Sequence, residues 1–199
     1  AARRQGRRRR LRVARSDRNA RRPGDDHRSV AGKRIAIARN ETTLAEFRQF
    51  WSDGGARERA QRPACRDRES FFSAKRTRGF EAPGFDQGAM HPVVCVAHAD
   101  AEAFAEWLGK RTGKRYRLPT SAEWLAFAAA APEATACQAN LADASYRAKF
   151  RDKDALACDD GRAETAPTRS FDAPAGAVYD IAGNVREWVS DCAPGCREH

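Results

Sequence analysis

Long apolar segments are absent from this 199-residue chain: nowhere do eighteen apolar residues follow one another, so the sequence predicts no membrane-spanning helix. Three catalytic or ligand-binding signatures are absent too, namely a serine nucleophile elbow, a phosphate-binding glycine loop and an HExxH motif. The six cysteines include no CxxC pair of the zinc-ribbon kind. The sequence therefore offers no motif for serine hydrolysis, nucleotide binding or zinc-dependent proteolysis.

Positive charge is in excess, and all of the excess lies at one end. The formal net charge is +10, and residues 1–34 hold thirteen arginines and one lysine against three aspartates. The same residues lack an aromatic side chain on which bases could stack and an apolar stretch of signal-peptide length. We expect residues 1–34 to be a disordered, Arg-rich tail, or a segment foreign to the natural domain, and residues 35–199 to be the folded domain. A nucleic-acid or acidic-lipid arm is the alternative for the tail, but no convincing nucleic-acid partner is predicted.

Six cysteines permit fifteen disulfide connectivities, and their order alone does not choose among them. Sequential pairing would close three local loops around irregular segments, and we predict bonds between Cys65 and Cys95, Cys137 and Cys158, and Cys192 and Cys196. Each of the two longer loops would add about 3 to 4 kcal/mol to the free energy of unfolding. Such bonds imply an oxidising, extracytoplasmic location, periplasmic or secreted. Six reduced and mostly buried thiols are the alternative.

The first regular elements are predicted after residue 34. Alternating apolar residues in KRIAIARNETTL, at Ile35 and Ile37, predict a half-buried strand. Thr43 and Glu46 then form the capping box of an amphipathic helix. The glycine-, arginine- and proline-bearing stretch over residues 54–88 is expected to be a long irregular loop, for which Cys65 is the candidate anchor.

Two further helices are predicted after a short buried strand over residues 92–96. Asp100 is expected to cap the first of them, and Gly113 permits its end. Thr120 and Glu123 form the capping box of the second. Two helices packed on small strands, with half of the chain in ordered loops, is an α+β pattern.

Two blocks carry most of the information in this sequence: HPVVCVAHADAEAFAEWLGKRTGKRYRLPTSAEW over residues 91–124 and YDIAGNVREWVSDC over residues 179–192. In their residues and in their order along the chain, the two blocks resemble the formylglycine-generating enzyme family, also called the sulfatase-modifying-factor family. The resemblance covers roughly residues 35–199. That family has a variant of the C-type lectin fold. The resemblance therefore implies an α+β domain in which two main helices pack on small sheets with long ordered loops.

The turn from Asp180 to Glu187 is the clearest candidate for a metal site. Calcium takes six to eight oxygens from carboxylates, amide side chains and main-chain carbonyls, and a turn with acids at both ends and glycine inside can converge them. Aligned with the GNVWEW turn of the family, the ligands would be the side chains of Asp180 and Glu187 and the carbonyls of Gly183 and Val185. The resemblance thus implies a structural calcium ion here.

A second calcium site of the family corresponds to the segments ANLAD and DDGRAETAP. The resemblance places its ligands at the side chains of Asn140 and Asp160 and at the carbonyls of Leu141 and Arg162. Without the resemblance, such Asp- and Asn-rich loops are ordinary turn chemistry, and that interpretation stays open.

The chain departs from the family pattern in places that bear on catalysis. Ala97-His98 stands where the family has Ser-Trp, and Arg186 stands where it has Trp. We expect His98 to be a packed or surface histidine and not a metal ligand. The family oxidises a substrate cysteine with oxygen and copper held by two cysteines, since thiolates select Cu(I). Those cysteines follow the turn, near a Gly-Gly-Ser strand and an Arg-rich strand that this sequence does not contain. Cys192 and Cys196 precede that position, and a local disulfide suits them better.

These observations favour a non-catalytic, calcium-stabilised binding or scaffold domain of the family, for which no catalytic residue is predicted. Its partner would be a protein or peptide ligand, because lectin-like folds carry variable recognition loops. The alternative is a truncated copper- and oxygen-dependent oxidase that converts a protein cysteine to formylglycine. Copper is expected only if the missing C-terminal segment exists.

Overall fold

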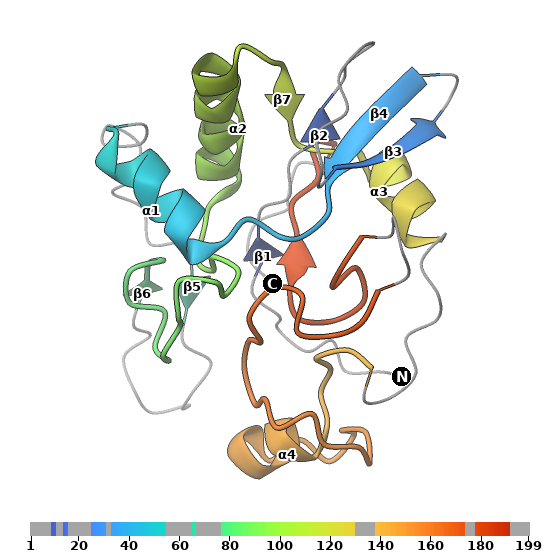
Figure 1. Ribbon diagram of the computed structural model, residues 1–199. Helices are drawn as coiled ribbons and strands as arrows, with labels where there is room; N and C mark the ends of the chain where they lie inside the picture. Colours follow the sequence, from blue (N-terminus) through green and yellow to red (C-terminus); the bar gives the residue numbers. More distant parts are fainter. Residues whose placement is uncertain are drawn as a thin grey trace.

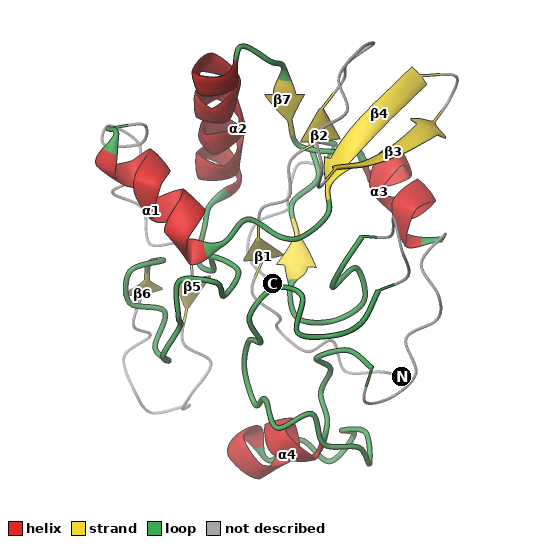
Figure 2. Cartoon of the chain, in the orientation of Figure 1, coloured by secondary structure: helices red, strands yellow, loops and turns green. Residues whose placement is uncertain are grey.

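The computed structural model describes residues 9–10, 14–15, 25–30, 33–54, 65–66, 77–129, 138–173 and 178–191. Its helices are α1 (Leu44–Ser52), α2 (His98–Thr112), α3 (Ser121–Ala128) and α4 (Ala144–Phe150). Its strands are β1 (Arg9–Arg10), β2 (Ala14–Arg15), β3 (Asp25–Val30), β4 (Lys33–Ala38), β5 (Cys65–Arg66), β6 (Thr77–Arg78), β7 (Tyr116–Arg117) and β8 (Arg186–Glu187). Helices, short strands and long loops make this an α+β chain (Figure 2). In these ranges no helix is both long and apolar enough to cross a membrane.

The main sheet has the strand order β3-β4-β2-β7, and its neighbouring strands are antiparallel. Its longest pairing joins β3 to β4 in register from Asp25 opposite Ala38 to Val30 opposite Lys33. Figure 1 shows this sheet at one end of the molecule and α4 at the other. The long loops between them, with the 180–187 turn, carry the candidate site.

The strands β1, β2 and β3 lie within residues 1–34, for which the sequence predicted a disordered tail and a domain start at residue 35. The structure differs from that prediction at these residues. Strand pairing joins main-chain N–H and C=O groups, so it needs no apolar periodicity. A search for apolar alternation therefore misses such strands. The other residues of the predicted tail lie outside the described ranges.

The largest core cluster lies where α1 packs against α2. The Phe47 and Phe104 rings are stacked with centroids 5.8 Å apart, and Phe50 meets both edge-on at 5.2 and 5.6 Å. The predicted capping box of α1 is confirmed, because Thr43 and Glu46 bond reciprocally. Helix α2 starts earlier than predicted: His98 is its first residue, and Ala97 is a cap without a side-chain bond. Asp100 lies in its first turn and is not the cap.

The apolar segment before α2 is buried as predicted, but it is not a strand. It forms one isolated bridge, between Pro92 and Thr43, and Val93 N donates to Thr42 O at 2.9 Å. Cys95 has a left-handed backbone with φ 58°, and this conformation interrupts an extended run. Burial alone does not make a strand, because a strand needs a continuous main-chain partner.

One predicted disulfide is confirmed: Cys65 is bonded to Cys95. The bond joins β5 to the buried segment before α2, where Val94 and Cys95 pack with Cys65 in a small core cluster. Cys65 therefore anchors the long loop, as the sequence predicted. The other two pairings stay predictions, since Cys137, Cys192 and Cys196 lie outside the described residues.

Candidate cation sites

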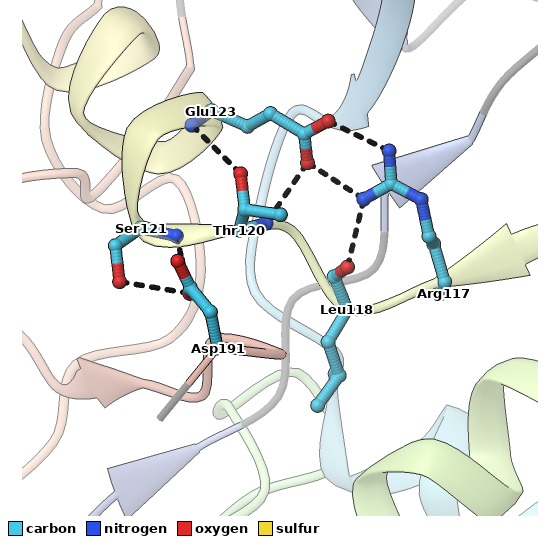
Figure 3. Close-up of polar contacts among 6 residues, drawn as sticks. All are labelled: Arg117, Leu118, Thr120, Ser121, Glu123 and Asp191. Atoms are coloured by element: carbon cyan, nitrogen blue, oxygen red, sulfur yellow. Dashed lines mark hydrogen bonds and ion pairs between the residues drawn. The ribbon is translucent and has the colours of Figure 1, made fainter. Parts of the chain in front are cut away.

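The start of α3 is held by a set of charge-assisted hydrogen bonds, drawn in Figure 3. Arg117 at the end of β7 donates to the two carboxylate oxygens of Glu123 at 2.6 and 2.7 Å. Glu123 also accepts from Thr120 N at 2.8 Å and completes the predicted capping box. The hydrogen bonds from Arg117 hold the pKa of the Glu123 carboxyl below its ordinary value. This fork fixes α3 to the sheet.

The same helix start also holds the chain that follows the 180–187 turn. Asp191 Oδ1 accepts from Ser121 N at 2.7 Å and from Ser121 Oγ at 2.9 Å (Figure 3). These two hydrogen bonds lower the pKa of the Asp191 carboxyl. Ser190 N donates to Pro119 O at 2.8 Å alongside them. The end of the turn is therefore docked on α3.

Both predicted carboxylate ligands of the turn are oriented by residues far away in sequence. Trp124 on α3 donates its indole N–H to Glu187 Oε2 at 2.6 Å. Arg169 N donates to Asp180 Oδ2 at 2.9 Å. Carboxylates oriented by N–H donors present their remaining lone pairs in fixed directions, as cation ligands require.

The main chain of the turn is tightly bent. Asp180, Gly183 and Asn184 all have left-handed backbones, with φ of 54°, 88° and 43°. Val185 N donates to Gly183 O across the bend. A Cβ added at Gly183 would lie 2.5 Å from Asn140 O, so only glycine fits where the turn meets the 140–141 loop. The two segments that carry the predicted cation ligands are thus in direct contact.

Main-chain and side-chain hydrogen bonds reinforce this contact. Asn184 N donates to Asn140 O at 2.7 Å, and Asn140 Nδ2 donates to Asn184 Oδ1 at 3.3 Å and to Glu164 O at 2.8 Å. The fully buried Glu41 accepts from Asn184 Nδ2 at 3.2 Å. Sequence analysis did not single out Asn184 or Glu41, although Asn184 stands inside the motif and Glu41 precedes the first capping box.

The second predicted site contains a group of three carboxylates. Oxygens of Asp143, Asp159 and Asp160 all lie within 4.8 Å of one another. Asp160 Oδ1 accepts from Arg162 N at 2.7 Å, whereas Asp160 Oδ2 is buried and has no hydrogen-bond partner among the described residues. Burial raises the pKa of the Asp160 carboxyl to about 6, and its two acidic neighbours act in the same direction.

Asp143 and Asp159 were missed by sequence analysis, although both stand in the segments that pointed to Asp160. Asp143 also has a local role, because its side chain accepts from Tyr146 N and caps α4. It also accepts from Asp160 N, and this bond brings the two segments together. The Asn140 amide, by contrast, is directed by its N–H groups toward Glu164 and the 180–187 turn.

The donor chemistry fits a hard divalent cation. All eight predicted ligands offer oxygen, which calcium prefers. A buried carboxylate oxygen without a partner is costly, and a cation at Asp160 Oδ2 would remove that cost. The close approach at Gly183 brings the 180–187 turn against Asn140 and Leu141 of the second predicted ligand set. The donor chemistry of the described residues therefore fits calcium at the Asp160 group, and in the 180–187 turn the structure shows two carboxylates that are each oriented by an N–H donor.

His98 is packed, which is one of the two placements that the sequence predicted for it. Its Nε2 lies 3.1 Å from Val189 O, its Nδ1 lies 3.5 Å from a Glu102 carboxylate oxygen, and its ring meets Trp188 edge-on at 5.3 Å. The Nε2 contact and the ring packing hold the imidazole in place. The candidate copper ligands Cys192 and Cys196 lie outside the described residues.

Comparison with known proteins gives one family for nearly the whole chain. The family described as "Sulfatase-modifying factor enzyme 1-like domain" matches residues 9–195. The formylglycine-generating enzyme of Streptomyces coelicolor is 36% identical over an alignment of 116 positions that covers 51% of this chain and 32% of that enzyme. A protein of Chlamydia pneumoniae named serine/threonine-protein kinase pkn1 is 31% identical over 138 residues, 69% of this chain and 19% of that protein.

Among solved structures, PvdO from Pseudomonas aeruginosa matches with a TM-score of 0.59 and 28% identity. The match covers 81% of this chain and 58% of PvdO. This chain spans about a third or less of the length of the two curated relatives, at 32% and 19%. The family match begins at residue 9 and so includes the strands that sequence analysis had placed in a tail.

Proposed function

Because the chain belongs to the sulfatase-modifying factor enzyme 1-like family, we propose that residues 35–199, with the strands that precede them, form a calcium-stabilised binding or scaffold domain without catalytic residues of its own. The proposed fold is the C-type lectin-like variant of the formylglycine-generating enzymes. The observation that carries the calcium proposal is the buried, unpartnered Asp160 Oδ2 beside two further carboxylates. One calcium ion would be held there and another at the 180–187 turn.

The eight predicted ligands would bind two separate calcium ions. Asp160 would supply its free oxygen to one ion, with the Asn140 side chain and the Leu141 and Arg162 carbonyls. Asp180 and Glu187, each oriented by an N–H donor, would hold the other with the carbonyls of Gly183 and Val185. Calcium would neutralise these acids and stabilise loops that contain little regular secondary structure.

Thermal unfolding with calcium and with excess chelator tests this proposal. A ligand that binds only the folded state at 100 times its dissociation constant adds about 2.7 kcal/mol to the free energy of unfolding. The melting temperature should therefore fall by several degrees on chelation, since about 1 kcal/mol moves it by about 2 to 4 °C in a domain of 150–250 residues. Asp160→Asn and Glu187→Ala should each reduce that calcium dependence.

The exposed carboxylate Asp86 provides the matched control. Asp86→Asn changes one acid outside both ligand sets, so it should keep the full calcium response. Identical melting curves for the wild-type protein with calcium and with chelator would refute the calcium proposal.

A second candidate function is copper- and oxygen-dependent conversion of a protein cysteine to formylglycine. The similarity to the enzyme from Streptomyces coelicolor, named formylglycine-generating enzyme, favours it. Its Cu(I)-binding thiolates are expected in a segment C-terminal to the turn, because Cys192 and Cys196 precede the position of the family's copper-binding pair. Incubation with copper, oxygen and a cysteine-containing peptide tests whether this chain has the activity: aldehyde formation would overturn the proposal of a domain without catalytic residues of its own.

We also propose an extracytoplasmic location and a protein or peptide partner. The bond between Cys65 and Cys95 supports the location, because disulfides persist in oxidising compartments. The long ordered loops support the partner, since recognition residues are concentrated on loops held by a rigid scaffold. Fractionation of the producing cell tests the location, and a cytosolic protein with reduced Cys65 and Cys95 would contradict it.

A further inference from the structure

Asn184 lies between the two candidate cation sites and is bonded to both segments that would form them. Its main-chain N–H donates to Asn140 O at 2.7 Å, and its Oδ1 accepts from Asn140 Nδ2 at 3.3 Å. Asn184 itself belongs to the 180–187 turn, whereas Asn140 belongs to the ligand set of Asp160. The two sites therefore share a direct asparagine pair.

This pair determines which end of the Asn140 amide can face a cation. The NH2 group of an asparagine has two hydrogens. Asn140 Nδ2 donates to Glu164 O at 2.8 Å and to Asn184 Oδ1 at 3.3 Å, so both hydrogens are used. The amide is thereby held with its nitrogen toward the turn, and its oxygen is left as the end available to a cation.

Asn184 is itself held in place on its other side. Ala166 N donates to Asn184 Oδ1 at 3.1 Å, and Asn184 Nδ2 donates to Ala166 O at 3.3 Å and to Glu41 Oε1 at 3.2 Å. Ala166 and Glu41 are both fully buried. Because its amide bonds to buried groups, Asn184 cannot rotate without breaking several hydrogen bonds.

The main chains of the two segments are also in contact. Asn140 O would lie 2.5 Å from a Cβ at Gly183, and Leu141 Cδ2 would lie 2.9 Å from it. Neither the 140–141 loop nor the turn can shift toward the other at this point. This close approach and the hydrogen bond from Asn184 N to Asn140 O link the positions of the two segments.

We propose that Asn184 is a positioning residue that couples the two cation sites, so that calcium bound at the turn raises the affinity for calcium at the Asp160 site. This inference rests on the proposed calcium function. Calcium bound to Asp180 and Glu187 would oppose opening of the turn, and the closed turn would keep the Asn140 amide in the orientation that its hydrogen bonds give it, with its oxygen available to the second ion. Coupling between sites is reciprocal, so the Asp160 site raises the affinity of the turn equally.

Calorimetric titration with calcium of the full chain tests the coupling. Asp160→Asn leaves only the turn to bind, and Glu187→Gln leaves only the Asp160 site. In each variant, the calcium affinity of the remaining site should be at least about fivefold lower than the affinity of the same site in the wild-type protein with the other site filled. A factor of about five is the lower end of typical coupling between sites. In the Asn184→Gly background the same comparisons should show independent sites. Glycine is chosen because position 184 has φ 43°.

A merely structural role for Asn184 would lower the melting temperature without changing the ratio of the two affinities. Gln49→Ala removes an exposed amide on α1 and should leave both affinities and their ratio unchanged. Equal affinities of each site with the other site blocked or filled would overturn the inference and leave the calcium proposal intact. Coupling that persists in Asn184→Gly would overturn the role of Asn184, and absence of any calcium heat in the wild-type protein would overturn both proposals.

Discussion

At position 183 the fold requires glycine for two separate reasons, conformation and space. The left-handed φ of 88° costs other residues about 1 kcal/mol or more, and an added Cβ would also meet Asn140 O at 2.5 Å. Gly183→Ala should therefore lower the free energy of unfolding by about 2 to 4 kcal/mol. Gly113→Ala is the matched control, because Gly113 has φ 66° and open space around its Cα. It should lose only about 1 kcal/mol in urea unfolding, and equal losses for the two variants would show that the contact with Asn140 is not tight.

Asn184 and Glu41 make long-range hydrogen bonds that their positions in the sequence do not reveal. Each is a polar residue next to a recognised motif, and nothing in its neighbours along the chain marks it as different from a turn or cap residue. Their hydrogen bond joins positions 143 residues apart. Asp143 is a similar case, because its capping of α4 is visible locally while its bond to Asp160 N is not.

Among the elements, α3 illustrates how a local signal acquires a long-range role. Its capping box was predicted from Thr120 and Glu123, and the structure adds Arg117, Asp191 and the indole of Trp124. Through these contacts one short helix fixes β7, the end of the 180–187 turn and Glu187. The capping box is formed by two residues three positions apart, whereas the residues that bond to the helix from elsewhere lie 6 to 70 positions away.

The Arg117–Glu123 fork predicts an acid-sensitive contribution to stability. The folded-state pKa of Glu123 is lowered, so its contribution is complete above its unfolded pKa of about 4.3 and is lost as the pH falls through the lower folded pKa. Urea unfolding measured from pH 6 downward should show a smaller acid-side loss for Glu123→Gln than for the wild-type protein. Glu46→Gln is the control, since Glu46 makes the same capping box on α1 without an arginine contact in the described ranges. Parallel acid-side curves for wild-type protein and Glu123→Gln would contradict the assignment.

For the whole molecule, the bond between Cys65 and Cys95 predicts how much the covalent link contributes. It closes a loop with a sequence separation of 30, for which chain entropy gives about 3 to 4 kcal/mol. The double variant Cys65→Ser/Cys95→Ser should lose roughly that amount in denaturant unfolding under oxidising conditions. The wild-type protein should lose a similar amount after reduction, and the double variant should then be insensitive to reductant. A wild-type protein equally stable with and without reductant would contradict the prediction.

The sequence by itself determined the elements and motifs that depend on neighbouring residues: the capping boxes of α1 and α3, their apolar faces, the 180–187 turn and the family resemblance, which the family match confirms. These follow from contacts three or four residues apart, which a single sequence displays directly. Only the tertiary structure decided that β3 pairs with β4 in place of a disordered tail, that the buried segment around Cys95 is not a strand, and that Asp143 and Asp159 join Asp160. It also decided that Asn184 meets Asn140. The reason is physical: main-chain pairing and side-chain convergence are long-range contacts that leave no periodic trace in the chain, because each depends on where the folded core places two distant segments.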